Sequence, residues 1–322
     1  MRVSVLIAAA ILSSGVVHAD YSQHPKAATF LASTVDQYGL SGQQVIDALK
    51  AAETEPKNLV SMKKSAEKTK TWAQYRKSFV TPLRVDLGHQ FIQKHGDLLK
   101  KAEQEYGVSA FVIAAILGVE TNYGGYTGNV SVLNALATLG FEHPRRSKFF
   151  LSELAAFIKL ADEQNWNIAE QRGSYAGAMG FSQFMPSNYR TLAVDFDKDG
   201  DVDLFSPADA IGSIGRYLQH HGWRSGEPVA VLAKSPKGFK SAAWPSSIKP
   251  SIASADLRSA GLSWDKEFSI DTDKVALIPL IGENAKEHWV ARHNFYVISR
   301  YNPRAKYAMA VYHLSVELAK SL

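Results

Sequence analysis

Residues 108–125 read V-S-A-F-V-I-A-A-I-L-G-V-E-T-N-Y-G-G and predict a helix that ends in a single acid. Positions 110–119 are apolar or glycine almost without a break, so this helix is apolar on every side and has to be buried. Glu120 is the only charged residue of the stretch and lies in the last turn. Burial and the negative end of the helix dipole both raise the pKa of such a carboxyl group. We therefore expect Glu120 to be a proton-donating acid, or else the structural partner of an Arg or Lys elsewhere.

The composition and the first residues indicate an exported protein. The chain has 322 residues, 46% of them hydrophobic, which is enough for a sizeable core. Residues 1–19 run from basic to apolar to small, so they predict a signal peptide cleaved after Ala19 and a soluble, periplasmic protein. The chain contains no cysteine, which excludes disulfides, thiolate catalysis and a membrane anchor carried on a cysteine. The net charge of +5, spread along the chain, favours a polyanionic cell wall over nucleic acid as partner, or is simply a soluble basic surface.

Hydrophobic periodicity predicts a mainly α fold with some β structure. Expected helices cover residues 25–37, 42–53, 85–106, 110–121, 131–139 (ended by Gly140), 143–161 (opened by His143-Pro144), a short one from 187, 207–221, and one opened by Asn302-Pro303. A strand is expected at residues 295–299.

The composition changes after Trp223 and predicts an insertion. Residues 224–290 are rich in Ser, Pro, Gly and Lys, with short β-like runs at 229–232 and 275–281. We accordingly divide the chain into a signal peptide (1–19), an N-terminal helical region (20–84), a helical core (85–223), a small β-containing insertion (224–290), and a strand and helix that complete the helical part (291–322).

The stretch 195–203, D-F-D-K-D-G-D-V-D, carries a carboxylate at every second position. Its first three aspartates fill positions 1, 3 and 5 of an EF-hand-like loop, and Gly200 follows at position 6. Ser206 stands where the closing Glu is expected, but Asp209 could close a loop that is three residues longer, 195–209. The pattern favours a structural Ca²⁺ site over a solvated acidic turn, because five unscreened aspartates repel one another.

Taken together, five motifs resemble those of lytic murein transglycosylases of the B type, over about residues 25–318. They are G-V-E-T-N-Y-G around Glu120, A-L-A-T-L-G-F-E-H-P-R-R at 135–146, S-Y-A-G-A-M-G-F-S-Q-F-M-P-S at 174–187, the acidic loop with D-A-I-G-S at 209–213, and N-F-Y-V-I-S-R-Y-N with Y-A-M-A-V near the end. Some members of the family carry a lipid-modified cysteine, and this chain has no cysteine, so a soluble form is expected.

The resemblance implies a lysozyme-like helical core with an additional helical region and a small inserted β-containing domain. It implies that Glu120 is the single catalytic acid and base. It further implies substrate-binding roles for Ser174, Gln183, Phe184, Tyr75, Arg145, Arg146, Tyr217, Tyr301, Asn302 and Tyr307, with both arginines facing carboxylates of the murein strand. The implied calcium ligands are Asp195, Asp197, Asp199, Asp209 and the backbone carbonyl of Asp201.

The implied reaction is cleavage of the β-1,4 bond between N-acetylmuramic acid and N-acetylglucosamine of peptidoglycan, without water and without an organic cofactor. Glu120 would protonate the glycosidic oxygen and then take the proton of the muramyl 6-hydroxyl, giving a 1,6-anhydro product. Ordinary glycosidases use two carboxylates, and one stands out here. A hydrolytic, lysozyme-like muramidase and an inactive, calcium-stabilised murein-binding protein stay open as alternatives. Proteins of cell-wall synthesis or division are possible further partners that the sequence does not identify.

Overall fold

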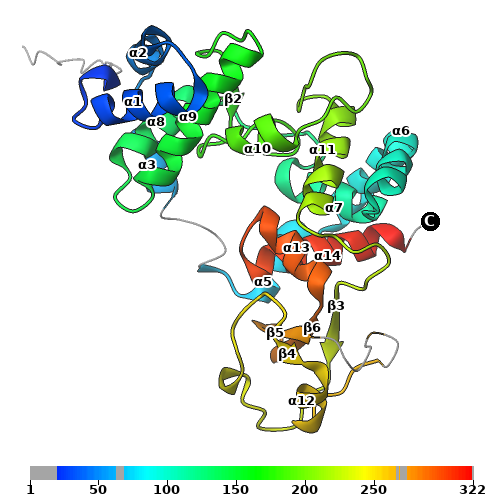
Figure 1. Ribbon diagram of the computed structural model, residues 1–322. Coiled ribbons are helices and arrows are strands. Elements are labelled where there is room, and N and C mark those ends of the chain that lie inside the picture. The colour runs from blue at the N-terminus through cyan, green and yellow to red at the C-terminus, as the bar shows by residue number, and fades with distance from the viewer. Residues whose placement is uncertain (1–19, 63–68, 266–267, 269–273, 321–322) are drawn as a thin grey trace, which may run out of the picture.

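The computed structural model describes residues 20–62, 69–265, 268 and 274–320 (Figure 1). The predicted signal peptide lies outside the described residues and stays a prediction. Among the residues described, no single helix is long and apolar enough to cross a membrane. The helices α6 (Pro82–Tyr106) and α7 (Ala110–Thr121) meet both conditions only as a pair, and they are bent by 116° relative to each other.

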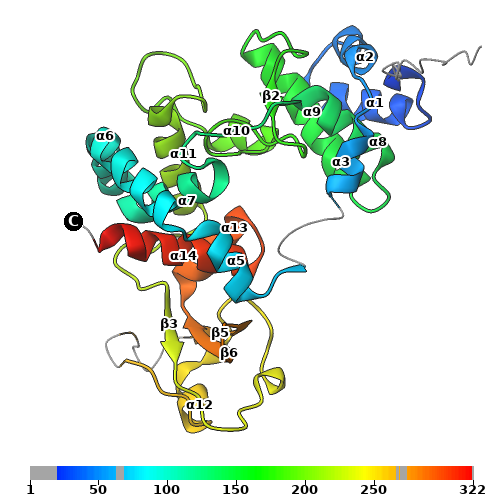
Figure 2. The ribbon, with the colours of Figure 1, turned by 180° about the vertical axis from the view of Figure 1, so that it is seen from behind.

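The chain folds mainly into helices, as predicted, and they gather in two groups (Figures 1 and 2). The α9 bundle consists of α1 (Ala27–Tyr38), α2 (Gly42–Ala51), α3 (Pro56–Ser61), α8 (Val132–Glu142) and α9 (Ser147–Glu163). The α7 bundle consists of α5 (Trp72–Phe79), α6 (Pro82–Tyr106), α7 (Ala110–Thr121), α11 (Pro207–His220), α13 (His293–Tyr301) and α14 (Ala305–Ala319). The short helix α10 (Pro186–Leu192) packs on both α9 and α11.

Helix α7 is the buried helix that the sequence predicts. All its residues from Val112 to Val119 are buried, so the absence of a polar face is matched by protein on every side. Gly118 lets α14 approach, because a Cβ there would lie 3.0 Å from Leu314 and 2.6 Å from the Tyr123 ring. Asn122, in the left-handed region at φ 53°, ends the helix, and its N–H bonds to the Gly118 carbonyl.

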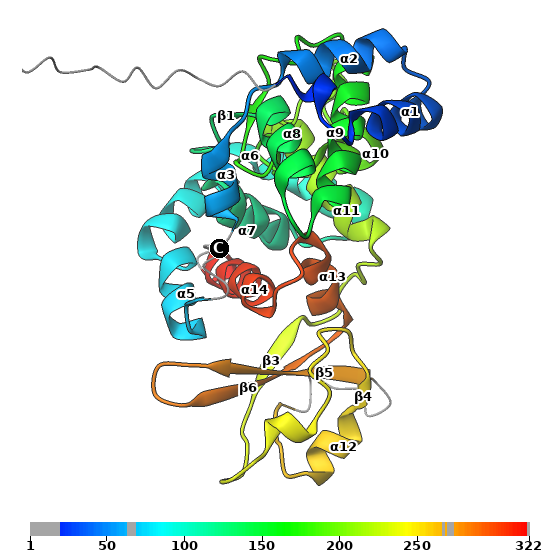
Figure 3. The same cartoon turned by 90° about the vertical axis from the view of Figure 1, so that its left-hand side faces the viewer.

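A four-stranded antiparallel sheet forms the lower part of the molecule, in the order β3-β6-β5-β4 (Figure 3). Its strands are β3 (Ala230–Ala233), β4 (Ile252–Ala253), β5 (Lys274–Ile281) and β6 (Lys286–Ala291), and α12 (Ser254–Ser259) follows β4. Along β5, Ala276, Ile278 and Leu280 belong to the core shared with the helices, whereas Val275 and Leu277 face a second, smaller core. The sheet is therefore packed on both faces and rests against the α7 bundle.

One expected element has the wrong type, and two expected helix boundaries are wrong. The strand expected at 295–299 is helix α13, because the short apolar run fits either period and its first N–H group is capped from another segment. Helix α8 continues through Gly140 to Glu142, since this glycine makes room for Leu151 of α9, 2.9 Å from where its Cβ would be. Helix α9 begins at Ser147, because His143 Nδ1 accepts the N–H groups of Arg145 and Arg146 and holds residues 143–146 in a turn.

The remaining short elements support the loops of the site. A two-stranded ribbon joins the start of α8 to the segment after α9, in antiparallel register. It consists of β1 (Val130–Ser131) and β2 (Arg172–Gly173), and the 3-10 turns are η1 (Tyr21–Gln23) and η2 (Ser241–Ala243).

Candidate active site

Glu120 and Tyr307 form the centre of the candidate site. Glu120 lies in the last turn of α7 and is partly exposed, while Tyr307 lies in the first turn of α14 and is 2% exposed. The Tyr307 hydroxyl donates to Glu120 Oε1 over 2.6 Å. The close packing of α14 on α7 brings the two residues together, so a phenol holds the carboxyl group in one orientation.

Three further aromatic rings extend from Tyr307 as a wall. Tyr301, at the end of α13, stacks on Tyr307 with an interplanar angle of 12° and 6.5 Å between the centroids. Tyr217 of α11 meets Tyr301 edge-on at 4.8 Å, and Phe184 lies 5.5 Å from Tyr217 and 5.8 Å from Tyr301. The sequence prediction brings these residues to one site, and the structure places them on four separate segments.

The hydroxyl groups of the wall are fixed donors. Tyr301 donates to the Ser182 carbonyl over 2.5 Å, and Tyr217 donates to the Arg300 carbonyl over 2.7 Å. Burial, followed by the charge of Glu120, raises the pKa of both Tyr301 and Tyr307, and burial raises that of Tyr217 to about 12. All three phenols therefore stay protonated at neutral pH, and Tyr307 can only donate to the carboxylate.

Tyr75 joins this group from the N-terminal side. It lies on α5, is 1% exposed and packs its ring 4.6 Å from that of Phe79. Its hydroxyl is close enough to Tyr307 to contribute to the raised pKa of that phenol. Since α5 packs on α14, Tyr75 lies beside Tyr307, and its role as a site residue stays a prediction.

The Gly- and Ser-rich segment 174–185 folds into a compact turn beside the end of α7. Ser174 Oγ accepts the N–H of Ala178 over 3.0 Å, and Gln183 Nε2 donates to the carbonyls of Gly180 and Thr127 over 2.9 and 3.0 Å. Gln183 has a φ of 50°, which non-glycine residues rarely adopt and which usually marks a functional turn. Both polar side chains thus hold the conformation of this segment, and the ring of Phe184 connects the segment to the other rings of the wall.

Arg145 and Arg146 lie in the turn before α9. The guanidinium of Arg146 covers the rings of Phe149 and Phe150 at 4.4 and 4.9 Å. Burial, and then the charge of Arg304, lowers the pKa of Arg146. Arg146 is thus a cation that faces a second arginine, from the loop between α13 and α14, and both Arg145 and Arg146 are exposed. Asn302 ends α13, and its carbonyl accepts the Arg304 N–H over 2.7 Å.

Sequence reasoning did not identify three residues that hold the site together. Thr121 Oγ1 accepts the Gly124 N–H over 3.0 Å and lies 3.1 Å from the Phe181 carbonyl, which ties the end of α7 to the 174–185 segment. Ser182 receives the Tyr301 hydroxyl through its backbone, so its residue type carried no signal. Arg304 follows the Tyr-Asn-Pro motif directly, and its basic charge was a usable signal.

The acidic loop gathers three of the predicted calcium ligands. Carboxylate oxygens of Asp195, Asp197 and Asp209 all lie within 4.8 Å of one another. Both oxygens of Asp209 accept backbone N–H groups, from Phe196 and Asp203, each over 2.7 Å. The carboxylates of Asp199 and Asp201 instead accept the N–H groups of residues 201 and 202.

This donor set fits a hard divalent cation. Oxygens that bind Ca²⁺ at about 2.4 Å lie within about 5 Å of one another, as these three do. Burial raises the pKa of Asp209, and the neighbouring Asp197 and Asp195 raise it further, while its two backbone donors oppose this. A cation between the three carboxylates would relieve their repulsion.

The chain is similar to known transglycosylases over almost its whole length. The model of the transglycosylase SLT domain family matches residues 22–316. The membrane-bound lytic murein transglycosylase B of Escherichia coli (strain K12) is 37% identical over 314 residues, covering 93% of this chain and 84% of that protein. The soluble lytic transglycosylase SltB1 from Pseudomonas aeruginosa is 41% identical, with a TM-score of 0.85 over 92% of this chain and 99% of that one. The Escherichia coli lytic transglycosylase Slt35 in complex with calcium is 37% identical, with a TM-score of 0.84 over 93% and 94% of the two chains.

Proposed function

This chain belongs to the transglycosylase SLT domain family and is a lytic transglycosylase, and we propose that Glu120 cleaves the β-1,4 bond between N-acetylmuramic acid and N-acetylglucosamine in peptidoglycan. The observation that carries this proposal is the hydrogen bond from Tyr307 to Glu120 at the edge of the aromatic wall. It orients one carboxyl group beside a surface of rings, which suits sugar binding.

The first step is protonation of the glycosidic oxygen by the Glu120 carboxyl group. The bond to the muramyl C1 then breaks, and the positive charge that develops there is stabilised by the sugar's 2-acetamido group or by dipoles of the site. Glu120 becomes a carboxylate in this step, and the Tyr307 hydroxyl stabilises that charge, because a hydrogen bond to an ionised group is stronger than one to a neutral group.

The second step uses the same residue as a base. The Glu120 carboxylate takes the proton of the muramyl 6-hydroxyl, whose oxygen attacks C1 and closes the 1,6-anhydro ring. One carboxylate is then sufficient. The buried Glu153 is not a second candidate, since its carboxylate accepts both the N–H and the hydroxyl of Ser187, at 3.0 and 2.8 Å, at the start of α10.

The neighbouring residues would bind the strand. Tyr75, Phe184, Tyr217, Tyr301 and Asn302 would line the sugar subsites with Ser174 and Gln183, whose segment lies beside the end of α7. Arg145 and Arg146 would face the lactyl or peptide carboxylates. The nearby charges of Arg146 and Arg304 support this role for Arg146, because two like charges favour an anion between them.

Calcium would act as a structural ion in the acidic loop. Asp195, Asp197 and Asp209 would supply carboxylate oxygens, with Asp199 and the Asp201 carbonyl as further ligands. Ion binding would fix the segment that leads into α11, which carries Tyr217. With the signal peptide cleaved after Ala19, the enzyme would work as a soluble periplasmic protein on glycan strands.

Glu120→Gln tests the assignment, because the amide keeps the size of the side chain but cannot donate or take the proton. Sacculi digested with the wild type should yield 1,6-anhydro muropeptides by mass spectrometry, and the variant should yield almost none. Products one water heavier would instead identify a hydrolytic muramidase. Lysis by the variant at the normal rate would refute the role of Glu120, and no lysis by the wild type would favour a murein-binding protein.

A further inference from the structure

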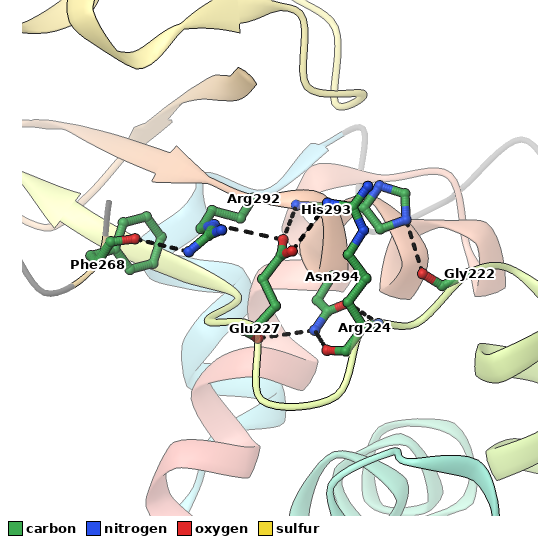
Figure 4. A network of polar contacts seen from close by, with 7 residues as sticks. All are labelled: Gly222, Arg224, Glu227, Phe268, Arg292, His293 and Asn294. Carbon is green, nitrogen blue, oxygen red and sulfur yellow. Dashed lines mark hydrogen bonds and ion pairs between the residues drawn. The ribbon is translucent and has the colours of Figure 1, made fainter. Parts of the chain in front are cut away.

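A polar network around Glu227 joins the two segments that connect the β-sheet part to the α7 bundle (Figure 4). The chain leaves the α7 bundle through residues 222–229 and returns to it at Arg292, directly before α13. The Arg292 N–H donates to the Val229 carbonyl over 2.9 Å, and His293 Nε2 lies 3.0 Å from the Gly222 carbonyl. The outgoing and returning segments are thus joined directly to each other.

Both polar atoms of the Asn294 side chain form hydrogen bonds in this network. Asn294 is completely buried, and its Oδ1 accepts the Arg224 N–H over 2.9 Å. Its Nδ2 donates to the carbonyls of Arg224 and Glu227, over 2.7 and 2.9 Å. A buried amide with three satisfied hydrogen bonds holds its two segments in one arrangement, because any shift would leave polar groups unpaired.

The Glu227 carboxylate binds the first turn of α13 and the residue before it. Its Oε1 accepts the His293 N–H over 3.0 Å and lies 3.6 Å from Arg292 Nε. Its Oε2 accepts Arg224 Nη1 over 3.1 Å. The side chain is only 11% exposed, so these contacts are little screened by water. Glu227 therefore caps α13 with a negative charge, as the positive end of a helix dipole favours.

Helix α13 connects this polar network to the candidate site. It has nine residues, which at about 1.5 Å per residue makes it roughly 13 Å long. Its last residue is Tyr301, which stacks on Tyr307, the hydrogen-bond donor of Glu120. A displacement of the first turn of α13 would be passed to Tyr301, because so short a helix moves as a rigid body.

We propose that Glu227 is a positioning residue for the reaction: by capping α13 it sets the place of Tyr301 and Asn302 beside Glu120. The inference rests on the proposed function of Glu120, and it assigns the stem of the sheet part a role in the site. Glu227 touches no reacting atom. Its loss is expected to lower kcat, which depends on exact placement, more than to raise KM.

Three substitutions separate the parts of this proposal. Glu227→Ala removes the cap and the charge, and we expect kcat on a soluble murein fragment to fall about 10-fold with KM changed less than about 2-fold. Glu227→Gln keeps an acceptor for the His293 N–H, so it should recover most of kcat. Asp162→Ala is the matched control, because Asp162 contacts Lys159 of its own helix α9 and Gln44 of α2, in the other helix bundle from α13, and kcat should not change.

Hydrogen exchange of the His293 amide is the second readout. It should accelerate in Glu227→Ala, slightly in Glu227→Gln and not in Asp162→Ala, all measured well below the melting temperatures. Unchanged kcat in a folded Glu227→Ala protein would overturn the proposal. If Glu227→Ala does not fold, Glu227→Gln alone decides: strongly accelerated exchange of this amide together with wild-type kcat overturns the proposal equally. Activity of Glu120→Gln would refute the proposed function instead, so the two failures are distinct.

Discussion

Tyr307 and Glu120 are 187 residues apart in the sequence and share a hydrogen bond of 2.6 Å. The phenol belongs to the closing helix α14, which packs closely on α7, and its raised pKa restricts it to the role of donor. A single acid that has to be neutral in one step and charged in the next benefits from such a partner, which favours the charged state without competing for the proton.

Tyr307→Phe should therefore lower kcat by about 10- to 100-fold, because a hydrogen bond to a charged group contributes about 1.5–3 kcal/mol. The alkaline limb of the pH–activity profile should also move to higher pH, since Glu120 has to start the reaction protonated and its carboxylate loses a stabilising donor. Tyr312→Phe is the control: it removes a hydroxyl of the same helix that donates to the Ala230 carbonyl, away from the site. Equal pH profiles for all three proteins would contradict the assignment.

Calcium should raise the melting temperature of the wild type relative to a sample with chelator, because an ion that binds only the folded state stabilises it. Asp197→Asn should remove most of this rise, since its carboxylate belongs to the three-oxygen cluster. Asp201→Asn, whose carboxylate accepts the neighbouring Val202 N–H, should keep most of it. Thermal unfolding with and without Ca²⁺ tests this, and equal responses of the two variants would refute the ligand set.

Acid should destabilise the protein partly through His313. Its ring lies between Trp72 and Trp289, at 5.2 and 5.1 Å, and burial lowers its pKa from 6.5 to about 4. The unfolded chain binds the proton first, so this contribution to stability is complete above about pH 6.5 and is lost as the pH falls toward 4.

His313→Phe keeps a ring between the two indoles but cannot titrate. The loss of unfolding free energy between pH 7.5 and 4.5, measured with urea, should be smaller in this variant by about 1–2 kcal/mol. His220→Gln, at an exposed position of α11, serves as control and should match the wild type. An unchanged slope in His313→Phe would show that this imidazole is not responsible.

Gly118→Ala should lower the free energy of unfolding by about 2–5 kcal/mol, as severe core substitutions do. The Cβ of the new alanine would lie 2.6 Å from Tyr123 and 3.0 Å from Leu314. Gly96→Ala is the matched change in α6, where nothing lies within 4 Å of the new Cβ. It should stabilise the protein by about 0.5–1 kcal/mol through helix propensity. Chemical denaturation distinguishes the two, and similar effects would refute the packing role of Gly118.

The sequence by itself determined the features that depend on neighbours along the chain. An unbroken apolar run required α7 to be buried, and the Asn-Tyr-Gly-Gly turn required it to end just after Glu120. Alternating aspartates brought Asp195 and Asp197 together, since a tight turn around Gly200 leaves them few other arrangements. Capping and periodicity were likewise enough for most helices of the α9 bundle.

Only the tertiary structure decided the pairings between distant segments. The run 295–299 fits a strand or a helix, and it became α13 because Glu227, from a segment about 70 residues earlier, caps its first turn. The donor of Glu120 could not be read from the sequence either, because many tyrosines precede it and only the packing of α14 on α7 selects Tyr307. Local patterns fix a buried helix and the acid at its end, whereas the choice of partner depends on which distant surfaces are complementary.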